Sequence, residues 1–106
     1  MMSSLPKPKP QIGGALDRGV AEDMARTLRA VADPTRLQIL SIILGSVDER
    51  ATVSQLADVL GLRQPTVTHH VRILLDDGFL KRVQDGKLGW LSVESSRRSA
   101  VEDFLR

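Results

Sequence analysis

Residues 52–78 read TVSQLADVLGLRQPTVTHHVRILLDDG, and this stretch decides the fold. Thr52 suits the N-cap of a short helix, and Gly61 suits its end. A second helix is predicted from about residue 64 to residue 77, with Gly78 as its terminator. Apolar residues recur at helical spacing in both segments: Val53, Leu56, Ala57 and Leu60 in the first, and Val67, Val71, Leu74 and Leu75 in the second. Two helices joined by a short turn that contains glycine are the outline of a helix-turn-helix.

A β-hairpin is predicted directly after this unit. The segments 80–83 and 88–93 favour strands, and they flank Asp85-Gly86, a dipeptide typical of hairpin turns. Trp90, on the second strand, is more typical of packing within the domain than of base stacking. Stacking on single-stranded nucleic acid needs a platform of several aromatic side chains. Besides Trp90, the chain has only two phenylalanines, Phe79 and Phe104, and no tyrosine, so no such platform is expected.

Further helices are predicted before and after this unit. Leu16, Val20, Met24, Leu28 and Val31 form one apolar stripe. Asp33-Pro34 then ends that helix and begins another, which is apolar on most sides from residue 37 to residue 44 and ends at Gly45. A short amphipathic helix follows the hairpin to the C-terminus. The order is four helices, a hairpin and a helix, which is a mainly α winged helix-turn-helix.

Length and composition favour one small globular domain. The chain has 106 residues, 42% hydrophobic and 26% charged, and a domain of this size gains from dimerisation. We expect residues 15–106 to form the domain and residues 1–14 to be a disordered basic arm, which either solubilises the protein or touches DNA phosphate. Lys7 and Lys9 account for the net charge of +2. With no secretory signal or membrane span evident, a cytoplasmic protein is expected.

Four motifs in order resemble the ArsR/SmtB family of bacterial transcription regulators. They are ADPTRLQIL (residues 32–40), QPTVTHHV (residues 64–71), DGFL (residues 77–80) and DGK (residues 85–87). The resemblance covers roughly residues 16–106. It implies a homodimeric winged helix-turn-helix protein that binds an imperfect DNA palindrome and usually represses. It also implies a dimer interface built from the first and last helices, to which we assign Leu16, Val20, Met24, Leu28, Val101, Phe104 and Leu105.

The helix that begins near Gln64 is the expected recognition helix. At 100° per residue, Thr68, His69, Arg72 and Asp76 share the face opposite the apolar positions. Gln64 can pair bidentately with adenine, threonine can contact either base type, and Arg72 lies where phosphate is the expected partner. In the family, the positions that match Gln64, Thr66, Thr68 and His69 are expected to touch DNA. A solvated polar face is the alternative, and His70 is expected to be a hydrogen-bonded packing residue.

Three basic residues flank this helix. Arg63 departs from the family, which prefers serine at this position, and a missing serine cap should cost about 1 kcal/mol. Arg63 either binds a DNA phosphate or is an ordinary exposed arginine. On the wing, Lys87 stands beside the tip and suits a minor-groove or phosphate contact, and Arg82 adds to it from the first strand.

The switch that controls such a regulator is not evident in the sequence. The family has two usual metal sites. The positions that match them here are Thr52 and Ser54 for one site, and Ser95 to Arg97 for the other. None of these residues supplies a thiolate, an imidazole or a carboxylate. The chain has no cysteine. No cofactor is needed for the fold, and a regulatory metal would need a non-standard site of carboxylates and histidine. Otherwise the switch is an organic ligand at the dimer interface, a partner protein, or absent.

Catalysis and protein interaction are the two other classes of function. No phosphate-binding loop, nucleophile elbow or HExxH pair occurs, so an enzyme is not expected. The alternative is a winged-helix protein-interaction module, or a regulator subunit whose sensing is done by a partner or by a non-standard metal site.

Overall fold

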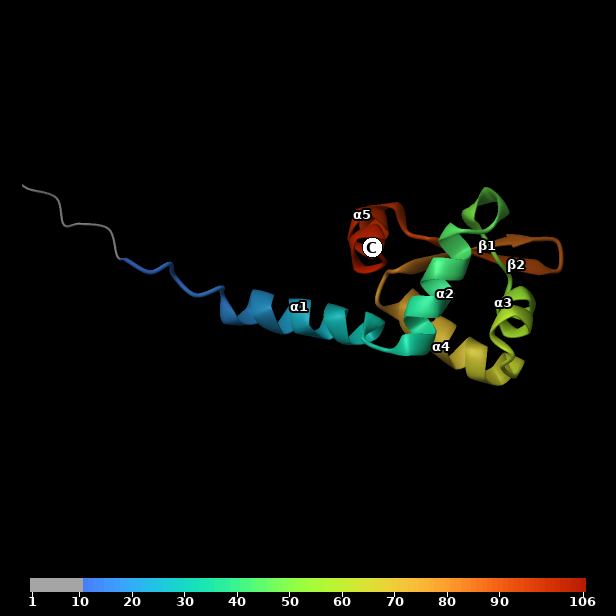
Figure 1. The fold of residues 1–106 in the computed structure, drawn as a ribbon, viewed down its shortest axis with the longest axis horizontal. Coiled ribbons are helices and arrows are strands. Elements are labelled where there is room, and N and C mark those ends of the chain that lie inside the picture. The colour runs from blue at the N-terminus through green and yellow to red at the C-terminus, as the bar shows by residue number, and fades with distance from the viewer. Residues whose placement is uncertain (1–10) are drawn as a thin grey trace, which may run out of the picture.

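The computed structural model describes residues 11–106, which form a winged helix-turn-helix (Figure 1). The helices are α1 (Arg18–Val31), α2 (Pro34–Leu44), α3 (Val53–Leu60), α4 (Gln64–Asp76) and α5 (Arg98–Phe104), and the strands are β1 (Leu80–Asp85) and β2 (Leu88–Val93). The predicted order of elements is confirmed, with two short 3-10 turns added, η2 (Val47–Glu49) and η3 (Ser95–Arg97). Most of the predicted basic arm lies outside the described residues, and residues 11–17 form no helix or strand.

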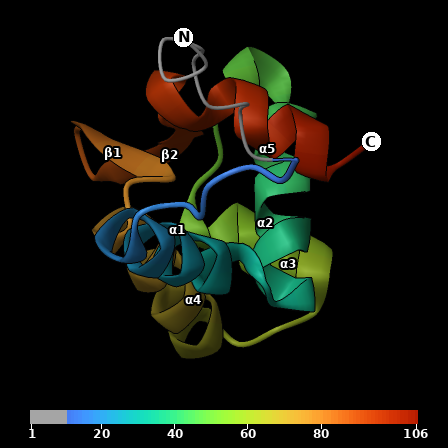
Figure 2. The same cartoon turned by 90° about the vertical axis from the view of Figure 1, so that its left-hand side faces the viewer.

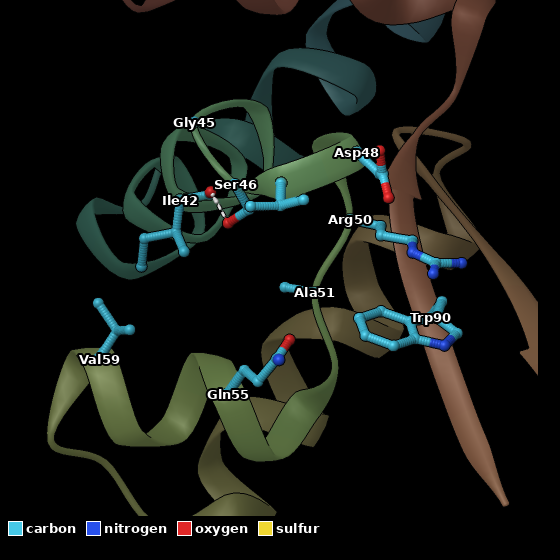
Figure 3. Close-up of a pocket in the computed structure, with 10 residues that line it drawn as sticks. Ile42, Gly45, Ser46, Asp48, Arg50, Ala51, Gln55, Val59 and Trp90 are labelled. Carbon is cyan, nitrogen blue, oxygen red and sulfur yellow. Dashed lines mark hydrogen bonds between the residues drawn. The ribbon is translucent and has the colours of Figure 1, made fainter.

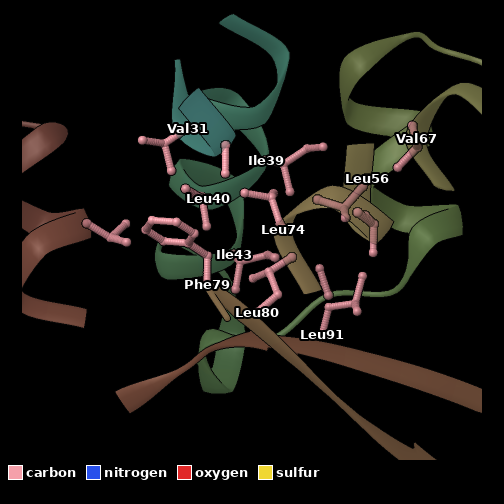
Figure 4. Packing of buried hydrophobic residues seen from close by; sticks show 14 of the residues in the cluster. Val31, Ile39, Leu40, Ile43, Leu56, Val67, Leu74, Phe79, Leu80 and Leu91 are labelled. Carbon is pink, nitrogen blue, oxygen red and sulfur yellow. The ribbon is translucent and has the colours of Figure 1, made fainter. Parts of the chain in front are cut away.

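The core is built around α2, whose apolar residues occur on most of its sides. Ile39, Leu40 and Ile43 of α2 are fully buried. They pack with Leu56 of α3, with Val67, Val71 and Leu74 of α4, and with Phe79, Leu80 and Leu91 of the hairpin (Figure 4). The helix-turn-helix is therefore held against a single core, and only one side of α4 faces that core.

Helix ends follow the residues that the sequence offers for them. Thr52 and Gln55 form a reciprocal capping box at the start of α3, with Gln55 N–H donating to Thr52 Oγ1 at 3.2 Å and Thr52 N–H donating to Gln55 Oε1 at 3.0 Å. Gly61 ends α3 with φ +66° and Gly78 follows α4 with φ +75°, a conformation that disfavours residues with a Cβ. The predicted caps are thus confirmed, and Gly61 ends α3 at the turn that leads to α4.

Asp33 caps α2, and its ionised form stabilises the fold. Its Oδ2 accepts a hydrogen bond from the N–H of Arg36 at 3.0 Å. Burial acts to raise the pKa of the Asp33 carboxyl, but this hydrogen bond and the Arg36 charge outweigh it and hold the pKa below its ordinary value of 3.8. Because the folded-state pKa is the lower one, this stability is present above pH 3.8 and is lost as the pH falls through the folded-state pKa.

Asp33→Ala should therefore lower the free energy of unfolding by about 1 kcal/mol at neutral pH. Urea unfolding measures this difference, which should shrink as the solution is acidified below the ordinary pKa of the carboxyl. Asp58→Ala, at an exposed position in α3, is the matched control and should cost much less. An equal loss in the two variants would contradict a capping role for Asp33.

The hairpin turn lies one residue later than predicted. Asp85 pairs with Leu88, so Gly86 and Lys87 are the two turn residues, and Gly86 has φ +60°. The positive φ suits glycine at the first turn position, and this preference displaces the predicted Asp85-Gly86 turn by one residue. Lys87 therefore stands at the tip of the wing itself.

Helix α1 extends away from the rest of the molecule (Figures 1 and 2). Asp17 caps it, with Oδ2 accepting from the N–H groups of Gly19 and Val20 at 3.1 and 3.3 Å, a cap that the sequence analysis did not assign. Only its C-terminal end is buried, through Ala30 and Val31. Val31 therefore belongs to the core of its own chain and not to the exposed part of the predicted stripe.

Candidate nucleic-acid interface

Helix α4 presents its polar side to solvent. Val67, Val71 and Leu74 are completely buried. Across the helix from them, and in its first turn, the exposed residues are Gln64, Pro65, Thr66, His69, Arg72 and Asp76, while Thr68 is half-buried. The first turn is thus the most accessible part of the helix, and it carries an amide and a hydroxyl that can read base edges.

Arg63 occupies the N-cap position of α4 and its side chain makes no capping hydrogen bond. The residue is exposed, and Pro65 follows it in the first turn. A cation at this end is opposed by the positive end of the helix dipole. The predicted loss of a cap is confirmed, and the Arg63 guanidinium remains accessible to an anion.

His70 lies beside α4's buried side and is held by Arg36 of α2. Its Nδ1 is 3.1 Å from Arg36 Nη1, a group that only donates, and 3.8 Å from Asp33 Oδ2. Arg36 Nε also donates to the carbonyl of Ala30 at the end of α1, at 2.6 Å. The prediction of a hydrogen-bonded packing histidine is confirmed, and Arg36 links α1, α2 and α4. His69, by contrast, is exposed.

The wing and the start of α3 form a shallow basic groove of about 300 Å³. Arg82 and Lys87 line it together with Thr52, Val53, Ser54, Gln84, Leu88 and Gly89. The structure thus brings the two predicted wing cations beside the α3 N-terminus, a place that favours anions. Ser54 and Gln84 were not assigned to this site from the sequence, because only the folded hairpin places them there.

An exposed apolar stripe runs along α1. Leu16, Val20, Met24 and Leu28 are each 47–57% exposed in the single chain. At the C-terminal end of the chain, Phe104 is exposed and Leu105 is half-buried. Val101 was assigned to this surface from the sequence, and this was wrong: its side chain is fully buried in the core of its own chain. A helical stripe does not tell which of its members face inward.

The positions that the resemblance assigns to metal ligands make other contacts within residues 11–106. Thr52 Oγ1 is engaged in the α3 capping box, and Ser54 follows it on the helix. Arg97 places its guanidinium 5.0 Å from the Phe79 ring centroid. Within residues 11–106, no group of three or more histidine, aspartate or glutamate side chains could hold a metal ion.

Trp90 and Arg98 join the loop around η2 to neighbouring elements. Trp90 is half-buried and stacks against Arg50, whose guanidinium carbon lies 4.1 Å from the ring centroid, so it packs within the domain as predicted. Arg98 of α5 binds both carboxylate oxygens of Glu49. The Arg98 guanidinium lowers the pKa of the Glu49 carboxyl, and Glu49 and Glu102 raise the pKa of Arg98.

Comparison with known proteins identifies the family. Residues 31–83 match the family model described as a helix-turn-helix domain. Over 63 residues the chain is 43% identical to a probable mercury resistance operon repressor from Streptomyces lividans, a match that covers 59% of this chain and 48% of that protein. A solved ArsR family transcriptional regulator is 29% identical, with a TM-score of 0.63 over 78% of this chain and 88% of that one. The chain belongs to the ArsR/SmtB family.

The ArsR/SmtB fold extends over most of the chain. The homodimeric winged helix-turn-helix DNA-binding domain Mb0332 from Mycobacterium bovis superposes with a TM-score of 0.71 at 20% identity, covering 89% of this chain and 86% of that one. The chain spans about half the length of the Streptomyces repressor. Among residues 11–106, no helix has the length and apolar character to cross a membrane.

Proposed function

We propose that this protein is a sequence-specific double-stranded DNA-binding transcription regulator. It acts as a homodimer in the cytoplasm, by occupying DNA without catalysing a reaction, and it represses until an effector changes its affinity. The observation that carries the proposal is the outward polar face of α4, with residues 64–66 exposed at its start, on a core that matches a helix-turn-helix family.

Each exposed side chain takes a role that its chemistry supports. Residues 64, 66, 68 and 69 carry the amide, hydroxyl and imidazole groups that read base edges in the major groove. The cations contact phosphate and fix the register of the protein on the duplex: Arg63, Arg72, Arg82 and Lys87. In this proposal the domain spans residues 15–106, and the arm of residues 1–14 adds phosphate contacts.

The homodimer would form through the exposed stripe of α1. Val20, Met24 and Leu28 on one face of the protruding helix, with Leu16 just before it, are large apolar side chains that are unfavourable in water, and a second copy with the same stripe would cover them. Phe104 and Leu105 would extend the interface from α5. Two-fold symmetry would then place both α4 helices on one side of the duplex.

Selection of binding sites from random duplex DNA tests this proposal. We expect enrichment of an imperfect palindrome, and an affinity that falls steeply with salt as counterions are released. Repeating the selection with divalent metals would show whether a non-standard metal site regulates binding. Binding without sequence preference, or a partner interaction that is insensitive to salt, would favour a protein-interaction module instead.

Arg63→Ser gives a second test, because it exchanges a proposed phosphate contact for a helix cap. The variant should bind DNA more weakly, and the slope of log affinity against log salt should become shallower by about 1.8, because the dimer loses two phosphate contacts. Its free energy of unfolding should rise by about 1 kcal/mol, because serine caps α4. Fluorescence anisotropy at several salt concentrations measures the slope, with Gln38→Ser on the exposed side of α2 as control. An unchanged slope would reject the phosphate contact.

A further inference from the structure

A cavity of about 510 Å³ opens between α2, η2, α3 and β2 (Figure 3). Its walls are largely apolar, formed by Ile42, Ala51, Val59 and Trp90. Small-molecule sites are commonly about 300–1,000 Å³, mostly apolar, with a few polar groups that orient the ligand. The cavity has the size and lining of such a site, and it is separate from the α4 face and from the α1 stripe.

One cation lines this cavity without a fixed counterion. The Arg50 guanidinium stacks on Trp90, and none of the ion pairs within residues 11–106 involves it. Stacking occupies a face of the guanidinium and leaves its N–H edges able to bind a carboxylate bidentately. Of the two neighbouring acids, Glu49 is already bound by Arg98, while Asp48 is exposed at the cavity.

The loop that forms one wall is held in an uncommon conformation. Asp48 and Glu49 both have positive φ, 56° and 52°, which is unusual for residues with side chains. Glu49 is fixed to α5 through Arg98, and Ala51 exchanges backbone hydrogen bonds with Leu91 of β2 at 3.0 and 2.8 Å. A ligand in the cavity would therefore contact a loop that is tied both to the wing and to the C-terminal helix.

We propose that this cavity binds a small apolar carboxylate and is the effector site. The apolar body of the ligand lies against Ile42, Val59 and Trp90, and its carboxylate pairs with Arg50. Binding of the ligand in the cavity shifts the positions of η2 and of the wing. The DNA-competent and DNA-incompetent forms of the protein therefore bind the ligand with different affinities. The regulatory step rests on the proposed function, whereas binding of the carboxylate does not.

Titration of the full chain with phenylacetate, in the absence of DNA, tests the binding step. Trp90 is the only tryptophan, so its fluorescence reports on this cavity alone, and calorimetry gives the affinity. The matched probes 2-phenylethanol and 2-phenylethylamine keep the ring and change the charge. We expect phenylacetate to bind about tenfold or more tightly than either, since a charged hydrogen bond is the stronger one. No response at Trp90, or equal or tighter binding of either matched probe, would overturn the proposal.

Two substitutions locate the carboxylate within the cavity. Arg50→Gln should weaken phenylacetate binding about tenfold, and Asp48→Asn should strengthen it by removing a like charge. Arg97→Gln is the matched control, because Arg97 also lies over an aromatic ring but outside the cavity, and it should leave the affinity unchanged. Equal losses in the two arginine variants would contradict the assigned site.

The regulatory step is tested with the selected duplex. Phenylacetate should change the DNA affinity of the natural chain several-fold and leave the Arg50→Gln variant unaffected. If the protein binds DNA but not phenylacetate, this inference is overturned and the proposed function stands. If it binds phenylacetate but not DNA, the proposed function is overturned and binding at the cavity stands. Binding of both without any coupling would overturn the effector role.

Discussion

Replacing Met24 with aspartate should convert the protein to a monomer and lower its affinity for the selected duplex about a thousandfold. Met24 lies in the middle of the α1 stripe and is half-exposed in the single chain. In a two-fold interface the substitution occurs twice, and each buried unpaired carboxylate costs several kcal/mol. Since about 1.4 kcal/mol corresponds to a factor of ten, loss of the dimer is expected. A monomer contacts only one half-site of the duplex and loses the contacts to the second.

The measurement is the molar mass in solution by light scattering, together with anisotropy titration against the duplex. Arg26→Asp is the control, since it also introduces an aspartate, with a larger change of charge, on the opposite side of α1, where Arg26 forms only an exposed ion pair with Asp23. This variant should remain dimeric. A dimeric Met24→Asp variant would contradict the assignment of the α1 stripe to the interface.

The double variant Gln64→Ala/Thr68→Ala should lose most of its preference for the selected sequence. Each direct base contact discriminates by about 1–3 kcal/mol, so the two together should reduce specific affinity by about a hundredfold or more. Binding to random duplex should be nearly unchanged, because phosphate contacts dominate it. Both positions lie outside the fully buried side of α4, so the fold should tolerate alanine.

Competition between selected and random duplex measures the specificity ratio directly. Asp76→Ala, at the far end of the exposed α4 face, is the matched control and should keep the ratio. If the double variant kept its ratio as well, the α4 face that carries Gln64 and Thr68 would not be the reading element. Arg72→Gln should behave differently from both, weakening specific and random binding alike.

Local chemistry made much of the fold predictable from the sequence. Asp33-Pro34 and Thr52 stop and start helices through their own backbone preferences, and each lies where it was expected. Gly61 ends α3 because the left-handed conformation at that point suits a residue without a Cβ. The apolar spacing in residues 64–77 likewise fixed which side of α4 is buried, and with it the candidate DNA-reading face.

Features that depend on long-range packing could not be predicted in this way. Arg36 and His70 lie 34 positions apart, so only the folded chain brings them together. Val101 shares its helix with Phe104, and helical spacing alone does not separate a residue facing its own core from one facing a partner. The cavity beside Trp90 likewise arises from four separate elements of the fold. Asp17 is different, since an aspartate just before a helix is a recognisable cap signal.

The central claim is that a dimer places two copies of α4 into successive major grooves of DNA. Hydroxyl-radical footprinting of the natural chain on its selected duplex tests this most directly. The account predicts two protected regions on one face of the duplex, their centres about 10 base pairs apart, matching a helix separation of about 34 Å. A single protected region, or none at low salt, would contradict it.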